Sequence, residues 1–345
     1  MTCAFAQAQT QICDRSPSSE LEKNTQAILS KTLNTQKIKS DSEFISPRSP
    51  SLENEKIKIK EALAATVQID NQCSGVYISN EGHILTAAHC ITSMLDPSAI
   101  EITVVDDFKT RLVTRKKTSF GDSLSYVNLV ENGKDSSEIL GKVVAMGAGF
   151  YVSLNSILAT QKNKNLLEEW LEKGYGPPED YAIIKVEKKD TPCVHVSHKE
   201  VTADEKIFSL GFPFDRIPSS PNDEFWAFSK GRVTRGVEEN EAFNRLLRKT
   251  SPEKRDYYVS IFKHTLNRPG VISSTVDENA GSNGSPLFNN EGELIGLLNA
   301  AEIFGFDDTK EYIEGVSQGV SLSKIKAEVQ KEFGNELVQR AFNCK

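Results

Sequence analysis

Short apolar segments, each bounded by turn residues, recur through most of this chain and constrain its fold more than any other feature. Val67 and Ile69 alternate with polar neighbours, as the side chains of a half-buried strand do. Residues 73–79 and 83–86 form two further runs, and the Asn-Glu-Gly sequence at 80–82 predicts a turn between them. Strands this short and this frequent favour an all-β fold, either a sandwich or a barrel.

The pattern continues toward the C-terminus, where helical spacing replaces it. Further strands are predicted at 100–105, 142–145, 181–186, 206–210, 231–234, 257–262, 286–288 and 294–298. Apolar side chains have helical spacing at 163–173, which Gly174 stops, and at 321–340, which Ser321 or Ser323 caps. We therefore expect a β-rich body that carries a C-terminal helix.

Composition limits the classes of partner. Of the 345 residues 38% are hydrophobic, and 41 basic against 48 acidic side chains give a formal charge of −7. This composition supports a sizeable core and argues against a nucleic-acid-binding surface. Every apolar run is shorter than the roughly 18 residues that a membrane-spanning helix needs, so we expect no membrane span.

The N-terminal segment differs from the rest of the chain. From about Gln7 to Lys56 it is polar and cannot bury enough apolar area to offset the entropy of ordering it. We interpret residues 1–59 as a polar leader, propeptide or linker, with a docking arm as the alternative. Ala-Phe-Ala at 4–6 has the form of a secretory cleavage site, so the sequence would begin late in a signal peptide. An arbitrary polar tail is the alternative. We expect a secreted or periplasmic protein.

Three segments carry reactive residue types in a defined order. The first is Thr-Ala-Ala-His-Cys at 86–90, directly after a predicted strand, and the second is Asp180, which opens an apolar strand. The third is the glycine-rich sequence Gly-Ser-Asn-Gly-Ser-Pro at 281–286. His, then Asp, then a nucleophile loop resembles the order in the trypsin/chymotrypsin-like serine peptidases, over about residues 60–340.

This resemblance implies an all-β fold of chymotrypsin type for residues 60–345. Two six-stranded antiparallel β-barrels would span about 60–187 and 190–319, and a C-terminal helix about 321–340. The catalytic residues would lie in the cleft between the barrels, because they come from both of them. Residues 93–175 are more than compact members of the family need, and we interpret them as an insertion near the cleft.

The resemblance also implies roles for individual residues. His89 would take the proton of the nucleophile and return it to the leaving amine. Asp180 would fix the tautomer of the imidazole, and Gly281 would turn a backbone N–H toward the oxyanion. Cys73 and Cys90 flank the strand pair that leads to the histidine, and the matching cysteines of the family are bonded. No metal or organic cofactor is implied.

The remaining cysteines leave their partners open. The chain has six cysteines, an even number that is compatible with disulfides. A bond from Cys13 to Cys193 or Cys344 would tie the leader to the body of the protein, but the sequence does not choose between pairings. It does not determine the oligomeric state either.

The nucleophile loop departs from the family at one position. The family pattern is Gly-x-Ser-Gly-(Gly/Ser)-Pro, which matches Gly281 and 284–286 but puts Asn283 where the nucleophile belongs. An amide is not a nucleophile that a base can activate. Three interpretations stay open: an inactive homologue that binds a peptide or protein, a one-residue shift that brings Ser282 to His89, or an engineered or erroneous substitution of serine. We predict a trypsin-like serine endopeptidase, with the inactive binding module as the alternative.

Two further residues bear on the substrate. Asp277 lies six residues before Asn283, the spacing at which trypsin-like members carry the acid of the primary pocket. Such a carboxylate would favour Arg or Lys side chains, and a solvated loop acid is the alternative interpretation. Asn299 lies in the segment 296–301, which would pair with the backbone of an extended substrate. The expected partner is therefore a protein or peptide substrate.

Overall fold

A computed structural model describes most of the body of the chain. The described residues are 43–45, 56–69, 73–88, 90–91, 100–105, 110–115, 125–131, 136–147, 180–212, 227–236, 239, 241–249, 251–252, 255, 259, 269–276, 283–306 and 309–345. The chain divides into two compact units, residues 1–38 with 303–312 and residues 39–302 with 313–345. The candidate site and its supporting strands belong to the second unit. Within the described ranges, no helix is both long and apolar enough to cross a membrane.

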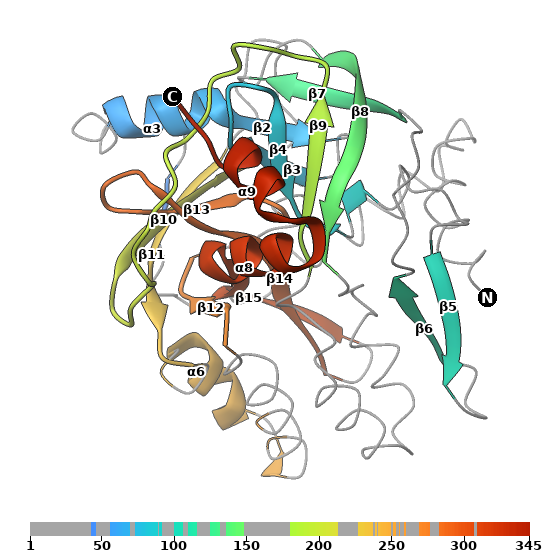
Figure 1. The fold of residues 1–345 in the computed structure, drawn as a ribbon. Helices are drawn as coiled ribbons and strands as arrows, with labels where there is room; N and C mark the ends of the chain where they lie inside the picture. Colours follow the sequence, from blue (N-terminus) through green and yellow to red (C-terminus); the bar gives the residue numbers. More distant parts are fainter. Residues whose placement is uncertain are drawn as a thin grey trace, which may run out of the picture. The chain divides into compact units, whose positions relative to one another are not determined.

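A closed antiparallel barrel forms the first lobe (Figure 1). Its six strands, in ring order, are β2 (Thr66–Ile69), β3 (Cys73–Tyr77), β4 (His83–Thr86), β9 (Ala182–Val186), β8 (Ser136–Met146) and β7 (Ser125–Glu131). Val67, Val76, Ile84 and Ile183 are fully buried in its core. The first barrel is thus confirmed, but the interpretation of residues 93–175 as an insertion is wrong in part, because β7 and β8 complete the barrel.

A seven-stranded sheet forms the second lobe. Its order is β1 (Glu43–Ile45), β11 (Ala227–Thr234), β10 (Lys206–Gly211), β13 (Pro286–Asn289), β14 (Leu294–Phe306), β15 (Thr309–Ser321) and β12 (Val271–Ser274), and β11 also pairs with β12. The strand β1 lies inside the segment expected to be a polar leader, and it pairs antiparallel with residues 228–230 of β11. The expected second six-stranded barrel is therefore not confirmed, because this part of the chain forms a seven-stranded sheet with β1 as an added edge strand.

Two helices are adjacent in sequence to strands of the two lobes. The helix α3 (Lys56–Ala65) precedes β2 and buries Ile59, Ala62 and Ala65, so ordered structure begins before the expected position at about 60. A further helix, α6 (Glu241–Lys249), follows β11. A separate two-stranded sheet joins β5 (Ile100–Val105) to β6 (Thr110–Arg115).

The expected C-terminal helix is two helices, α8 (Leu322–Phe333) and α9 (Asn335–Ala341). Ser321 caps α8 as predicted, because its side chain accepts the N–H of Lys324. Gly334 separates the helices with a φ of 93°, a conformation that a single continuous helix does not contain. Ile325, Val329 and Ala341 are fully buried in the main core, so both helices pack on the body. The helix predicted at 163–173 lies outside the described residues, and so does the strand predicted at 257–262 except for residue 259, which is helical.

Candidate active site

Strands β4 and β9 bring two predicted catalytic segments to the same edge of the barrel. Their antiparallel register pairs Thr86 with Ala182. The end of β4 that leads toward His89 and the start of β9, directly after Asp180, therefore lie side by side. Asp180 is 1% exposed.

A disulfide joins Cys73, the first residue of β3, to Cys90, the residue that follows His89. This is the pairing that the family resemblance implies. The Cys90 N–H donates to the carbonyl oxygen of Ala87 over 3.2 Å, which turns the chain directly after β4. Closing a loop over a sequence separation of 17 contributes about 3 kcal/mol in the chain-entropy model. Turn and disulfide together hold the neighbours of His89 against β3.

The predicted nucleophile loop docks on the open end of the β3–β4 hairpin. The N–H of Ser74 donates to the carbonyl oxygen of Asn283 over 2.8 Å, and Cys90 Sγ lies 3.8 Å from the same oxygen. The N–H of Gly284 donates to the carbonyl oxygen of Leu298 in β14 over 2.7 Å. Asn283 and Gly284 thus lie between this hairpin and a strand of the second sheet.

Glycine is required at position 284 for two reasons. Its φ is +82°, in the left-handed region that other residues adopt at a cost. A Cβ at this position would also collide with the carbonyl oxygen of Ser74 and with Oγ1 of Thr86. This residue is therefore seated against the strands that lead to His89, next to the position where the family pattern places the nucleophile.

The strand β14 flanks the loop on its other side. The N–H of Leu298 donates to the carbonyl oxygen of Ser285 over 2.8 Å. The hydroxyl of Ser285 is buried and has no hydrogen-bond partner in the described part of the chain, so it is not presented to a substrate. Asn299, predicted to contact substrate, follows Leu298 and is only 2% exposed. Its contact with a substrate stays a prediction.

Four of the predicted site residues lie outside the described residues: His89, Asp277, Gly281 and Ser282. Of their chain neighbours, the structure brings Cys90 Sγ to 3.8 Å from the carbonyl oxygen of Asn283, and Asp180 precedes the strand that pairs with β4. The contacts of the imidazole with Asp180 and with the loop stay predictions, as does the acidic primary pocket.

Ser74 is the residue of this site that sequence reasoning missed. Its N–H binds Asn283, its carbonyl oxygen accepts the hydroxyl of Thr86 over 2.7 Å, and its own hydroxyl accepts the N–H of Phe212 over 2.9 Å. A Cβ on Gly211 would meet the hydroxyl of Ser285. A glycine inside the strand pattern at 206–211 was the available signal, because it often marks a close approach of two segments.

The chemistry of the loop depends on its side chain at position 283. An asparagine amide donates and accepts hydrogen bonds, but a neighbouring base cannot convert it into an alkoxide or thiolate. In the described ranges, no group of three or more His, Cys, Asp or Glu side chains is placed to hold a metal ion.

Solved structures of proteases resemble this chain at low sequence identity. No curated protein sequence matches the chain at a significant level. The crystal structure of the serine endoprotease from Yersinia pestis is 13% identical with a TM-score of 0.42, over 81% of this chain and 66% of that chain. The active form of the Rv3671c protease from M. tuberculosis is 13% identical with a TM-score of 0.41, over 86% of this chain and 92% of that chain.

The family of trypsin-like peptidase domains matches residues 73–297, more than half of the 345 residues. The matched region begins at the disulfide-bonded Cys73 and ends on β14, so it includes the His89 segment, Asp180 and the loop at 281–286. The chain belongs to the trypsin-like serine peptidase family.

Proposed function

We propose that this chain is a trypsin-like peptidase domain that binds extended peptides without cleaving them, because Asn283 occupies the position of the nucleophile. The observation that carries the proposal is the position of Gly284, which lies against Ser74 and Thr86 and donates its N–H to Leu298. We call this arrangement the seating of Gly284. This seating identifies Gly284 with the glycine that follows the nucleophile in the family pattern. The residue before it is then Asn283.

The same seating argues against a loop shifted by one residue. Bringing Ser282 into the place of Asn283 would move Asn283 into the place of Gly284. An asparagine there would have a φ near +82° and a Cβ that collides with the carbonyl oxygen of Ser74. The shift would also remove the hydrogen bond from Ser74 to the carbonyl oxygen of Asn283. The structure therefore favours the unshifted loop, which lacks a hydroxyl at the reacting position.

Peptide binding does not require the nucleophile. Asp180 precedes the strand that pairs with β4, and Asn299 lies on the strand next to the loop, which supports the proposal of a peptide-binding site there. An extended peptide would pair with β14 beyond Asn299, and Asp277 would favour an Arg or Lys side chain in the primary pocket. In this proposal the β11–β12 pairing closes the second sheet into the second barrel, and the protein acts outside the cytoplasm.

A gain-of-function substitution tests the proposal directly. Asn283→Ser restores a hydroxyl beside the predicted base, so we expect hydrolysis of an arginine-containing chromogenic peptide to rise roughly 10³-fold or more. A fluorophosphonate probe, whose phosphorus a reactive serine attacks with loss of fluoride, should label this variant at position 283 and leave the natural protein unlabelled.

Matched variants separate the two interpretations of the loop. In the shifted loop, the natural protein would be labelled at Ser282, and Ser282→Ala would abolish that labelling. This result would overturn the proposal. In the unshifted loop, Ser282→Ala leaves the activity of the Asn283→Ser variant in place. Calorimetric titration of the natural protein with an arginine-containing peptide, compared with Asp277→Asn, then measures binding without cleavage.

A further inference from the structure

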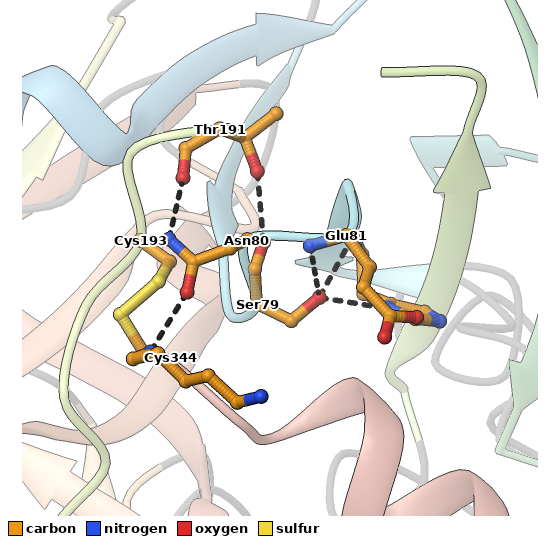
Figure 2. Close-up of a disulfide and its surroundings, with 8 residues drawn as sticks. Ser79, Asn80, Glu81, Thr191, Cys193 and Cys344 are labelled. Atoms are coloured by element: carbon orange, nitrogen blue, oxygen red, sulfur yellow. Dashed lines mark hydrogen bonds between the residues drawn. A yellow bond between two sulfur atoms is a disulfide. The ribbon is translucent and has the colours of Figure 1, made fainter. Parts of the chain in front are cut away.

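A second disulfide bonds residues 335–345 to the connection between β9 and β10, which is hydrogen-bonded to the turn of the β3–β4 hairpin, at the end away from the candidate site. Cys193, in the connection between β9 and β10, is bonded to Cys344 (Figure 2). This pairing excludes the bond from Cys13 to either residue that the sequence had left open. We call the turn 79–82, the connection 191–197 and residues 341–345 together the C-terminal corner.

Asn80 is the centre of the hydrogen bonding in the C-terminal corner. Its side-chain amide donates to the carbonyl oxygen of Thr191 over 3.1 Å, and its own carbonyl oxygen accepts the N–H of Thr191 over 3.3 Å. Its side-chain oxygen accepts the N–H of Lys345 over 2.7 Å. In Figure 2, Asn80 lies between Thr191 and the Cys193–Cys344 bond. One side chain therefore joins the turn, the connection and the last residues of the chain.

Besides the hydrogen bonds and the disulfide of the C-terminal corner, α9 contacts the body through a few apolar side chains and one ion pair. Ala341 is fully buried and Phe342 is 8% exposed, whereas Leu337 and Val338 are only partly buried. The ion pair between Arg340 and Glu81, at 3.3 Å, is more than half exposed on both sides. Such an exposed pair contributes little, so a short helix with a small buried face depends on the covalent bond beside it.

The connection that carries Cys193 also contacts both lobes. Val194 donates its N–H to the carbonyl oxygen of Tyr77 in the barrel, over 3.1 Å. On the other side, Ser197 donates to the carbonyl oxygen of Leu294 over 2.9 Å, and Leu294 donates to that of His195 over 2.8 Å. The disulfide therefore attaches the segment after α9 to a connection that is itself hydrogen-bonded to both lobes.

The two disulfides differ in their access to a reductant. Cys193 and Cys344 are both partly exposed. Cys90 is partly exposed as well, but its partner Cys73 is buried, with 6% of its surface exposed, and Cys90 Sγ lies 3.8 Å from the carbonyl oxygen of Asn283. Thiol–disulfide exchange requires the attacking thiolate to reach a sulfur atom, so access decides which bond reacts first.

We propose that the Cys193–Cys344 disulfide is a redox-controlled latch, which a dithiol reductant opens to release α9 from the barrel. One thiolate of the reductant attacks a sulfur of the latch and displaces the other cysteine as a thiol. The second thiol of the reductant then attacks the mixed disulfide, which leaves two cysteine thiols and the reductant as a cyclic disulfide. Two electrons pass to the latch, and Cys73–Cys90 stays oxidised. The latch is independent of the chemistry at position 283.

Stepwise reduction of the full chain tests the order of opening. The protein is treated with increasing dithiothreitol under native conditions, alkylated with iodoacetamide and analysed by peptide mass spectrometry. We expect Cys193 and Cys344 to be alkylated at least 10-fold faster than Cys73 and Cys90. Equal rates for the two pairs, or faster alkylation of Cys73 and Cys90, would overturn the latch.

Amide hydrogen exchange tests what opening releases. In the selectively reduced protein, we expect exchange in 335–345 to accelerate at least 10-fold, while β3 and β13 keep their protection. Reoxidation should restore the slow exchange. If 335–345 keeps its protection after reduction, or if all strands lose protection together, the disulfide is a structural staple and the proposal is wrong.

Two variants keep the test independent of the reductant. Cys193→Ser with Cys344→Ser should reproduce the fast exchange of 335–345 without any dithiothreitol. Asn80→Ala in the oxidised protein is the matched control, because it removes hydrogen bonds of the same corner and keeps the covalent bond. We expect it to leave 335–345 protected until the disulfide is reduced. Equal acceleration in the oxidised Asn80→Ala protein would show that the disulfide does not hold α9.

Discussion

Each end of the β3–β4 hairpin has a disulfide nearby, but the two ends are otherwise held in different ways. At the open end, Asn283 and Gly284 are fixed by backbone hydrogen bonds and by a space that admits only glycine. At the turn end, the C-terminal corner is fixed by the side chain of Asn80, a partly exposed ion pair and a disulfide. Backbone hydrogen bonds at the open end do not depend on the side chain at position 283, so the open end keeps its shape when that side chain changes. Contacts made by side chains can be lost when one residue changes, so the turn end can be regulated.

The largest loss of stability is expected when a side chain fills the space around position 284 at the open end. Gly284→Ala adds a Cβ against Ser74 and Thr86 at a φ of +82°, and it combines overpacking with backbone strain. We expect a loss of about 4 kcal/mol in the free energy of unfolding, measured by urea denaturation.

Gly292→Ala is the matched control, because Gly292 has the same φ of +82° but only the side chain of Lys58 near it, at 3.5 Å or more. Strain alone should cost this variant about 1 kcal/mol. Equal losses for the two variants would mean that the space around position 284 is less restrictive than the structure indicates.

The second effect concerns a buried histidine at the turn end. The hydroxyl of Ser79 accepts the N–H groups of Glu81 and His83, so it donates its own proton to His83 Nδ1 over 2.7 Å. The neutral imidazole therefore carries its proton on Nε2. Burial lowers the pKa of His83 to about 4; the charge of Lys185 also lowers it, Glu81 opposes the shift, and Arg340 adds to it.

Stability should therefore fall as the pH falls from about 6.5 to about 4. Between these values the unfolded chain binds a proton at His83 and the native protein does not, so each step toward acid favours unfolding. The total loss is about 3 kcal/mol, and it stops growing below the native pKa. His83→Gln should show a smaller loss over the same range in urea denaturation. The same pH dependence in both proteins would show that His83 is not the titrating group.

The open end was largely predictable from the sequence because its chemistry is local. The segments at 86–90 and 281–286 and the strand that follows Asp180 each carry their signal within a few residues, and strands 83–86 and 100–105 have the predicted bounds. Ser74 was missed because its role comes from three contacts with distant segments, and nothing in its neighbours indicates them.

At the turn end, the sequence predicted the turn at 80–82 but not the contacts that hold it. The bond between Cys193 and Cys344 spans 151 residues, and cysteine spacing does not determine such a pairing. The break at Gly334 was hidden because apolar side chains continue at helical spacing from Phe333 to Val338 across it. The strand β7 and the first part of β8 were assigned to an insertion, because only residues 142–145 of β8 were predicted as a strand and the chain length between His89 and Asp180 was weighed above the local apolar pattern.

A third loss of stability should show how much the hydrogen bonds of Asn80 contribute at the turn end, apart from the charged groups there. Asn80→Ala removes the side-chain bonds to Thr191 and to Lys345. We expect a loss of about 2 kcal/mol in the free energy of unfolding of the oxidised protein, because the Thr191 carbonyl loses a partner inside a part-buried corner. Asn80→Asp keeps the acceptor for Lys345 and should lose less. If Asp and Ala cost the same, the bond to Lys345 contributes nothing.

The smallest effect is expected from the ion pair beside this asparagine. Arg340 and Glu81 approach to 3.3 Å, but their side chains are 56% and 55% exposed, so solvent and salt screen the attraction. Arg340→Ala should change the free energy of unfolding by about 0.5 kcal/mol or less in urea denaturation at neutral pH.

The same substitution should have a clearer effect on the titration of His83. Because the charge of Arg340 lowers the pKa of His83, removing it should raise that pKa slightly, a change that NMR titration of the imidazole can detect. A large loss of stability with an unchanged histidine titration would instead make Arg340 a packing residue. The turn end would then be held by apolar contact of α9 rather than by Asn80 and the disulfide.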